Sequence, residues 1–363
     1  MALADQRFSK RRRAIAAQLA SKRIDALLVT SSVGLRYFSG FTGSNGALLI
    51  PKDLRAKIAT DGRYTTQIAA EVPDIAAIIA RPPAEALLET LNGYVRVGFE
   101  ANTVTYEQLQ QFARAAGDEV ALIPVSGEIE QLRAIKDPVE LQSLREVAAL
   151  ATEAFEELIA AGGIAPGRTE LEVAADLEYR MRSKGAQRPS FDTIVASGPN
   201  GAMPHHSAGK RILATGDLVT IDFGAYLDGY NSDMTRTVGL GKISSELEEL
   251  YDLVYQAQIA GVAAALPGTS LAEVDKTCRD IIEEAGFGQY FNHSTGHGIG
   301  LEVHEYPWAA TSGTGELVEN QTLTIEPGIY IPGKGGVRIE DTLIITAGKP
   351  ETITTAPKEL RLL

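Results

Sequence analysis

Five short segments of the chain each contain one residue that can bind a divalent metal ion. These residues are Asp222, Asp233, His297, Glu326 and Glu340. Four carboxylates and one imidazole suit hard to borderline cations such as Mn²⁺, Co²⁺, Zn²⁺ or Fe²⁺, and bridging carboxylates can neutralise the charge of a pair of ions. The residue types therefore make a hydrolase with two metal ions the leading hypothesis.

The first two acids lie in a predicted β-hairpin. The β-rich runs 218–226 and 230–238 flank residues 228–229, an Asp-Gly pair of the kind that forms tight hairpin turns. If this pair is the turn, Leu227 pairs with Tyr230. That first pair fixes the register of every pair that follows.

This register places both acids on one face of the hairpin. Asp222 lies opposite Thr235 and Asp233 lies opposite Gly224, and strand alternation turns all four residues to the same side. The two aspartates are then roughly 7–8 Å apart at the backbone, and Gly224 between them would leave room for ions. Solvent-facing turn acids are the alternative. Asp222 argues against it, because an unpaired carboxylate in the apolar run LVTIDFGAY is costly to bury.

The last two acids of the set repeat this pattern. Runs 323–331 and 337–345, joined by the glycine-rich segment 332–336, are predicted to form a second hairpin with an acid in each arm. Arg338 and Glu340 alternate along the strand and so face the same side, where the arginine could orient the carboxylate or hold a substrate anion. A surface ion pair between these two residues is the alternative.

The histidines are concentrated in one part of the chain, and the first 204 residues contain none. They are His205, His206, His293, His297 and His304. His297 stands between glycines in TGHGIG, and flanking glycines permit close approach of the backbone to a ligand. His205 and His304 are candidate donors to an oxyanion.

The ordered motifs PHH, DFG, DGYNSDMTRT, GHGIG, HE, EPGIY and RIED resemble the pita-bread metallopeptidases. This family includes methionine aminopeptidase, aminopeptidase P and Xaa-Pro dipeptidase (prolidase), with creatinase as a metal-free relative. The resemblance covers the C-terminal two-thirds of the chain. It implies that Asp222 and Asp233 chelate one metal ion, that Asp233, His297 and Glu326 contact the other, and that Glu340 bridges the two. Mn²⁺ is the family's commonest ion, with Co²⁺, Zn²⁺ and Fe²⁺ as alternatives.

The N-terminal third resembles the proline-specific branch of the family. The segments RYFSGFTGSNGALLI (36–50) and TDGRYTTQ (60–67) are similar to the N-terminal domain of aminopeptidase P, prolidase and creatinase. We therefore expect hydrolysis of Xaa-Pro bonds, favouring an Xaa-Pro dipeptidase over an aminopeptidase P that acts on longer peptides. A pita-bread module that binds peptides without cleaving them is the alternative from another class, and retention of all five ligand residues argues against it.

The resemblance and the chemistry together suggest roles for the other candidate residues. Two cations would lower the pKa of a water and polarise the scissile carbonyl. Glu326 could carry the water's proton to the leaving nitrogen, while His205 and His304 stabilise the oxyanion. By resemblance, the proline side of the substrate is lined by His293, Tyr330 and Arg338. His206 receives no role.

The length of 363 residues predicts two domains, because it exceeds what a single core usually holds. We expect an α/β N-terminal domain at residues 1–130 and an α+β pita-bread catalytic domain at residues 131–363, with a mainly antiparallel sheet. Strands are expected in the first domain at 25–30, 47–50, 57–60, 75–80 and 96–99. The second should begin with a helix from Pro138, capped by Asp137 and ending at Gly162. Further helices are expected at 171–183, 245–265 and 271–285.

Charge and cysteine content limit the partners and the compartment. A net charge of −13 argues against a nucleic-acid binder, and no window is apolar enough to span a membrane. The opening MALADQRFSKRRR lacks the apolar core of a signal peptide, and the single Cys278, expected in a buried helical position, fits the cytoplasm. The run Lys10–Arg13 is predicted to be a solvated helix face, with targeting or anion binding as the alternative. We expect a homodimer that acts on proline-containing peptides.

Overall fold

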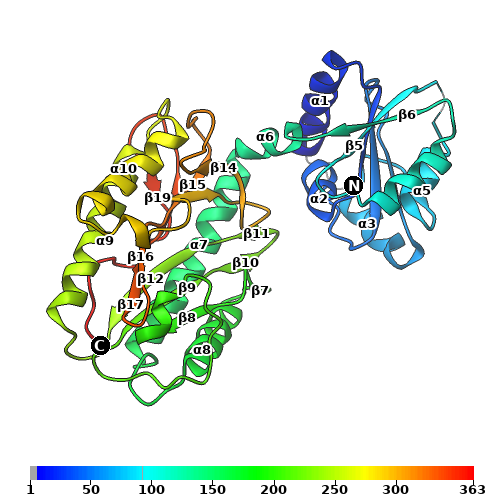
Figure 1. Cartoon of the computed structure of the whole chain (residues 1–363). Helices are drawn as coiled ribbons and strands as arrows, with labels where there is room; N and C mark the ends of the chain where they lie inside the picture. The colour runs from blue at the N-terminus through cyan, green and yellow to red at the C-terminus, as the bar shows by residue number, and fades with distance from the viewer. Residues whose placement is uncertain (1–5, 92) are drawn as a thin grey trace. The chain divides into compact units, whose positions relative to one another are not determined.

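The computed structural model describes residues 6–91 and 93–363 (Figure 1). The chain divides into two compact units, one ending at Arg133 and the other spanning Ala134–Leu363. All five candidate metal ligands belong to the second unit. Across the described residues, no helix combines the length and the apolar character that crossing a bilayer requires.

The first unit is built on a six-stranded mixed sheet with the order β4-β3-β2-β1-β5-β6. Its strands are β1 Ala26–Val29, β2 Gly46–Pro51, β3 Lys57–Thr60, β4 Ala77–Ile79, β5 Arg96–Glu100 and β6 Ala121–Val125. Its helices are α1 Gln6–Ser21, α2 Ser32–Ser39, η1 Gly62–Tyr64, α3 Thr65–Glu71, α4 Pro83–Leu88, α5 Tyr106–Ala116 and α6 Glu128–Ala134, the last reaching the boundary. The predicted α/β architecture and its five strands are confirmed. Strand β6 was not predicted, because it is only partly buried and contains a proline.

The basic run at the start of α1 is not simply a solvated face. Arg11 and Arg12 are only 9% and 8% exposed. Their guanidinium groups donate hydrogen bonds to the backbone carbonyls of Tyr37 and Phe38, at 3.0 and 2.8 Å, at the C-terminal end of α2. Arg12 also pairs with Asp74. The prediction was wrong for these two arginines, because they satisfy the carbonyls that a helix end leaves without intrahelical partners.

The helices of the second unit begin and end close to the predicted residues. They are α7 Pro138–Ala160, α8 Glu170–Ser183, α9 Ser245–Ala264 and α10 Leu271–Glu284, with short turns η2 Gly198–Ala202 and η3 Gly288–Tyr290. Asp137 caps α7 by accepting hydrogen bonds from the amides of Val139 and Glu140, as its sequence predicted. Cys278 is buried in α10, also as predicted.

Two apolar cores underlie the strands of the second unit. One core is shared by α7, α8 and the hairpin that carries Asp222, and the other by α9, α10 and the hairpin that carries Glu326. The strands are β7 Arg188–Pro189, β8 Ile194–Ser197, β9 Leu218–Phe223, β10 Ala225–Leu227, β11 Tyr230–Asn231, β12 Met234–Gly239, β13 Gly296–Gly298, β14 Glu305–Ala309, β15 Thr322–Ile325, β16 Gly328–Ile331, β17 Gly335–Arg338, β18 Asp341–Ile344 and β19 Glu351–Thr352. Their pairings are antiparallel, which confirms the predicted α+β class.

The first hairpin has the predicted register. Leu227 pairs with Tyr230 and Asp222 pairs with Thr235. Both arms are interrupted at Gly224 and Asp233, between β9 and β10 on one side and between β11 and β12 on the other (Figure 1). A Cβ atom on Gly224 would lie 1.8 Å from the carbonyl oxygen of Ser232. The glycine therefore makes room for the opposite backbone and not, as predicted, for ions.

The second hairpin is interrupted in the same way. Ile325 pairs with Asp341, and Gly328 pairs with Arg338, so both arms break where Glu326 and Glu340 stand. The turn is shorter than predicted, because Gly335 pairs with Ile331 and only residues 332–334 remain in the loop. Asp233, Glu326 and Glu340 thus lie at the gaps between ladder segments, whereas Asp222 is paired within β9 beside the first gap.

Candidate metal centre

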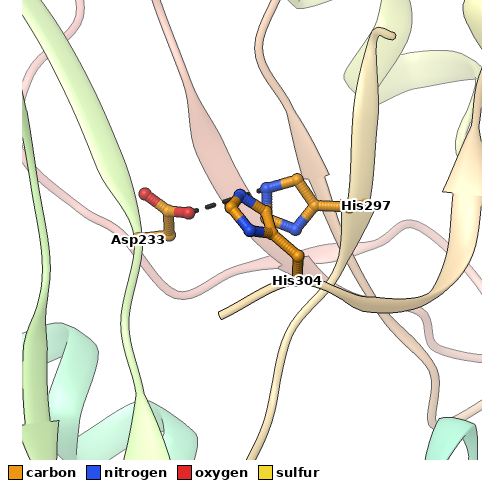
Figure 2. Close-up of side chains that lie close together, drawn as sticks. All are labelled: Asp233, His297 and His304. Carbon is orange, nitrogen blue, oxygen red and sulfur yellow. Dashed lines mark ion pairs between the residues drawn. The ribbon is translucent and has the colours of Figure 1, made fainter. Parts of the chain in front are cut away.

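The five predicted ligands converge in the second unit. Their ligand atoms form overlapping groups in which the atoms lie within 4.8 Å of one another: Asp222 with Asp233 and Glu340, and His297 with Glu326 and Glu340. A third group joins Asp233, His297 and His304, which Figure 2 shows with the two imidazoles beside the aspartate. Glu340 belongs to two groups, so its carboxylate lies at the middle of the cluster.

His297 is held with one ring nitrogen toward the carboxylates. Its Nδ1 lies 3.0 Å from the carbonyl oxygen of Gly298, so an Nδ1–H donates there and leaves Nε2 as the ligand atom. Nε2 lies 3.3 Å from Glu326 Oε1 and 3.6 Å from Asp233 Oδ2. The glycines flanking His297 let strand β13 pack closely against its neighbours. A Cβ at Gly296 would prevent this, because it would lie 1.7 Å from the Thr324 carbonyl oxygen. The predicted close approach is therefore to a strand and not to a ligand.

Hydroxyl and guanidinium donors fix the carboxylates but leave two oxygens without partners. Thr235 donates its hydroxyl to Glu340 Oε2 at 2.8 Å, and Arg338 donates to Asp222 Oδ2 at 2.6 Å. The second oxygens, Asp222 Oδ1 and Glu340 Oε1, are buried and have no hydrogen-bond partner among the described residues. A buried carboxylate oxygen without a donor is costly, and a cation removes that cost.

The cluster also has an excess of negative charge. Burial and the neighbouring carboxylates, first that of Glu340, raise the pKa of Asp233 well above its usual value. Burial and the charge of Glu326 likewise raise the pKa of Glu340. Burial would also raise the pKa of Glu326, but the hydrogen bond with His297 and the charges of His297, His293 and Arg338 together outweigh burial and lower this pKa. Two orphaned oxygens and crowded carboxylates fit bound divalent cations, which supply the missing positive charge.

A second group of residues adjoins the carboxylates. Arg338 is buried and donates from Nη1 to the Tyr330 hydroxyl oxygen at 2.9 Å, while His293 Nε2 lies 2.8 Å from the same hydroxyl. Arg338 also donates to the Thr235 hydroxyl and, at 3.3 Å, to the Pro204 carbonyl. The three residues predicted to line the proline side of the substrate are therefore one connected network.

The carboxylates line a cavity of about 860 Å³. His205, His293, His304 and Arg338 line the same cavity, so the structure brings the predicted residues together, with Tyr330 joined through its hydroxyl. An apolar part of the lining was not predicted from the sequence; it includes Leu171, Ala174, Phe191, Ile194 and Trp308. Trp308 is 43% exposed and its ring centroid lies 6.0 Å from that of His297. Trp308 is the chain's one tryptophan and lies four residues after His304, so the sequence alone could have indicated it as a candidate site residue.

An antiparallel α+β unit whose two interrupted hairpins deliver four carboxylates into one cavity, with a histidine from strand β13, defines a metal-dependent hydrolase of the pita-bread type. Family models agree: residues 142–347 match metallopeptidase family M24, and residues 11–135 match the creatinase/prolidase N-terminal domain. The chain belongs to metallopeptidase family M24.

The similar proteins are peptidases by name. The chain is 44% identical to the uncharacterized peptidase YqhT of Bacillus subtilis over 94% of its length and 96% of that protein. Among solved structures, an Xaa-Pro dipeptidase from Bacillus anthracis matches with a TM-score of 0.94 and 42% identity, covering 98% of this chain and 100% of that one. An X-Pro aminopeptidase from Thermotoga maritima matches with a TM-score of 0.89 and 35% identity, covering 98% and 99%.

Proposed function

We propose that the protein is a dinuclear metal-dependent peptidase that hydrolyses Xaa-Pro bonds, acting as an Xaa-Pro dipeptidase. The observation that carries the proposal is the convergence of all five metal-binding side chains with the Arg338 network in one cavity. The similarity to proteins named Xaa-Pro dipeptidase supports the substrate class. A peptide-binding module without catalysis would have no need for crowded, orphaned carboxylates, which destabilise the metal-free fold.

Asp222, Asp233, His297, Glu326 and Glu340 would hold the ions, with Mn²⁺ as the proposed metal because carboxylate-rich sites suit it. Bound ions of this kind lower the pKa of a water and polarise a carbonyl group. Glu326 is placed to accept a proton from the attacking water and to release it to the leaving proline nitrogen, since its carboxylate lies in the cluster and faces the cavity.

The histidines supply donors for the oxygen that becomes negative. His205 and His304 both line the cavity and are exposed to it, so their ring N–H groups can donate to the tetrahedral oxyanion. Burial and the nearby charge of His297 lower the pKa of His304, which favours a neutral ring with a single N–H. Neither ring is needed to bind the ions in this assignment.

A substrate carboxylate would need a cationic or hydrogen-bonding anchor in the cavity. Among the described residues that line the cavity, Arg338 is the one arginine or lysine. Its guanidinium already makes four hydrogen bonds, to Thr235, Pro204, Tyr330 and Asp222, which leaves one of its five donors. Both ring nitrogens of His293 also have partners.

This engagement of Arg338 and His293 favours a second candidate, an aminopeptidase P. A dipeptidase selects its substrate by binding the carboxylate that follows proline, and few free donors remain here for such an anion. An aminopeptidase needs no such contact, because its substrate continues past proline. The Thermotoga maritima structure is named for this activity.

Rates on matched peptides test both candidates. We expect kcat/KM for Leu-Pro to exceed that for Leu-Ala by about 10²-fold or more, since a pocket shaped for the proline ring selects by fit. Equal rates on Leu-Ala and Leu-Pro would refute proline specificity. Faster cleavage of Leu-Pro-Pro than of Leu-Pro would replace the dipeptidase by the aminopeptidase.

The net charge of −13 disfavours association with nucleic acid. We also propose a homodimer, and light scattering on the eluting protein measures its mass directly.

A further inference from the structure

The N-terminal residue of α8 is a buried carboxylate with no part in the reaction described above. Glu170 is fully buried, yet it lies in a helix whose other polar residues are mostly exposed. Burial would raise the pKa of Glu170, but hydrogen bonds led by those of Ser197 and His206 outweigh it and lower the pKa. The carboxylate is therefore held as an anion by the segment packed against it.

All the donors to Glu170 that the structure describes come from one segment, residues 197–209. Oε1 accepts from the Ser197 amide at 2.8 Å, from the Ser197 hydroxyl at 2.7 Å and from Asn200 Nδ2 at 2.9 Å. Oε2 lies 2.8 Å from His206 Nε2 and accepts from the Gly209 amide at 3.2 Å. The Glu170 side chain thus binds both ends and the middle of this segment by hydrogen bonds.

The same segment carries His205 and forms a wall of the cavity. Residues 204–208 all line the cavity beside the carboxylates. On the side away from Glu170, Arg338 donates to the carbonyl oxygen of Pro204 at 3.3 Å. His205 therefore stands between two fixed points, the Pro204 carbonyl on Arg338 and the His206 ring on Glu170.

We infer that Glu170 and His206 are positioning residues that hold His205 at the reacting centre. The inference rests on the proposed function, in which His205 donates to the oxyanion. The His206 ring is held by the Glu170 carboxylate and anchors its neighbour, because a ring fixed on a buried carboxylate restricts the backbone that the two histidines share. Loss of the anchor frees that backbone, and a displacement of about 1 Å at a catalytic donor can cost on the order of 10² in rate.

Four variants, compared on Leu-Pro with Mn²⁺ present, test this inference. His206→Ala should lower kcat by roughly 10–100-fold while KM and metal content stay near those of the parent protein. His206→Gln should restore most of the rate, because its amide nitrogen can reach the position of Nε2. In a His205→Ala background, adding His206→Ala should cost less than about 3-fold, since the two changes remove the same interaction.

A matched control separates positioning from stability. Glu172→Ala removes an exposed carboxylate from the same turn of α8, where it forms the capping box with Thr169. It should lower Tm without changing kcat. Full activity of His206→Ala would overturn the inference. An equal loss of kcat from His206→Ala in the parent protein and in the His205→Ala background would overturn it too. Either result would leave the proposed function standing. Unchanged kcat in His205→Ala would instead overturn the role proposed for His205, and the inference with it.

Discussion

Removing one carboxylate from the metal-free centre should make the protein more stable. Asp233 is 4% exposed and shares its surroundings with the carboxylates of Asp222, Glu326 and Glu340, and its raised pKa shows that the site disfavours its charge. Asn has nearly the same shape and carries no charge. Asp233→Asn therefore relieves repulsion in the stripped protein while it removes a ligand from the loaded one.

The size of the effect follows from these surroundings. A buried polar group without a partner costs about 1–3 kcal/mol, and more when it is charged. His297, 3.6 Å away, and proton uptake offset part of this cost for Asp233. We expect a gain of about 1–3 kcal/mol in the free energy of unfolding, or roughly 2–10 °C in Tm for a domain of this size.

Bound metal should make the parent protein more stable than Asp233→Asn. An ion at 100 times its dissociation constant stabilises the folded state by about 2.7 kcal/mol, and the variant loses this contribution where Asp233 is a ligand. Calorimetry with chelator and with excess Mn²⁺ gives the four Tm values required. A variant that is less stable than the parent under both conditions would refute the reasoning.

A second buried aspartate provides the control. Asp275 accepts hydrogen bonds from Arg279 and Thr295, and these outweigh burial so that its pKa is lowered. Asp275→Asn is the same chemical change in a site that favours the charge. It should lower Tm with and without Mn²⁺.

The stripped protein should also lose stability as the pH rises. The pKa values of Asp233 and Glu340 are raised by burial and neighbouring carboxylates, and that of His297 is raised because its contact with Glu326 outweighs burial. A group with a higher pKa in the folded state than in the unfolded state loses its stabilising effect as the pH rises between the two values. We expect Tm of the stripped protein to fall from about pH 5 to about pH 8 and to fall less in Asp233→Asn. The pKa of Glu326 is lowered, so its protonation changes the stability only at lower pH.

Two further substitutions test the residues beside the centre. His304→Ala should lower kcat by roughly 10²–10³-fold with the metal content unchanged; because His304 also lies beside Asp233 and His297, loss of an ion on metal analysis would make it a ligand instead. Arg338→Lys should lower kcat/KM by about 10²-fold or more, because a lysine cannot keep the hydrogen bonds to Asp222, Tyr330 and Thr235 together, and parent-like kinetics would show that this network does not position the substrate.

The sequence predicted the parts of the site that depend on local rules. The Asp-Gly turn fixed the register that pairs Asp222 with Thr235, because alternation and turn type act over a few residues. The register holds across the interruption at Gly224, where the ladder breaks and resumes without a shift. What Gly224 accommodates could not be predicted, because the opposing Ser232 carbonyl approaches it only in the bent hairpin.

Contacts between distant segments could not be predicted from one sequence. Glu170 and His206 lie 36 residues apart, with the rest of α8, two strands and the turn η2 between them, and no periodicity in the sequence joins an α8 carboxylate to a loop histidine. The burial of Arg11 and Arg12 could not be predicted either, because it depends on where α2 ends relative to α1. Residue types predicted the ligands, but the residues that hold them come from tertiary packing.

Metal occupancy and turnover, measured together on one sample, test whether hydrolysis depends on a pair of bound metal ions. The stripped protein is titrated with Mn²⁺, and bound Mn²⁺ per chain is compared with the rate of Leu-Pro hydrolysis. The fluorescence of Trp308, beside His297, reports binding independently of activity. We expect no turnover in the stripped protein, about two ions bound per chain at saturation and activity that rises with their occupancy. Full turnover by the metal-free protein would contradict this expectation.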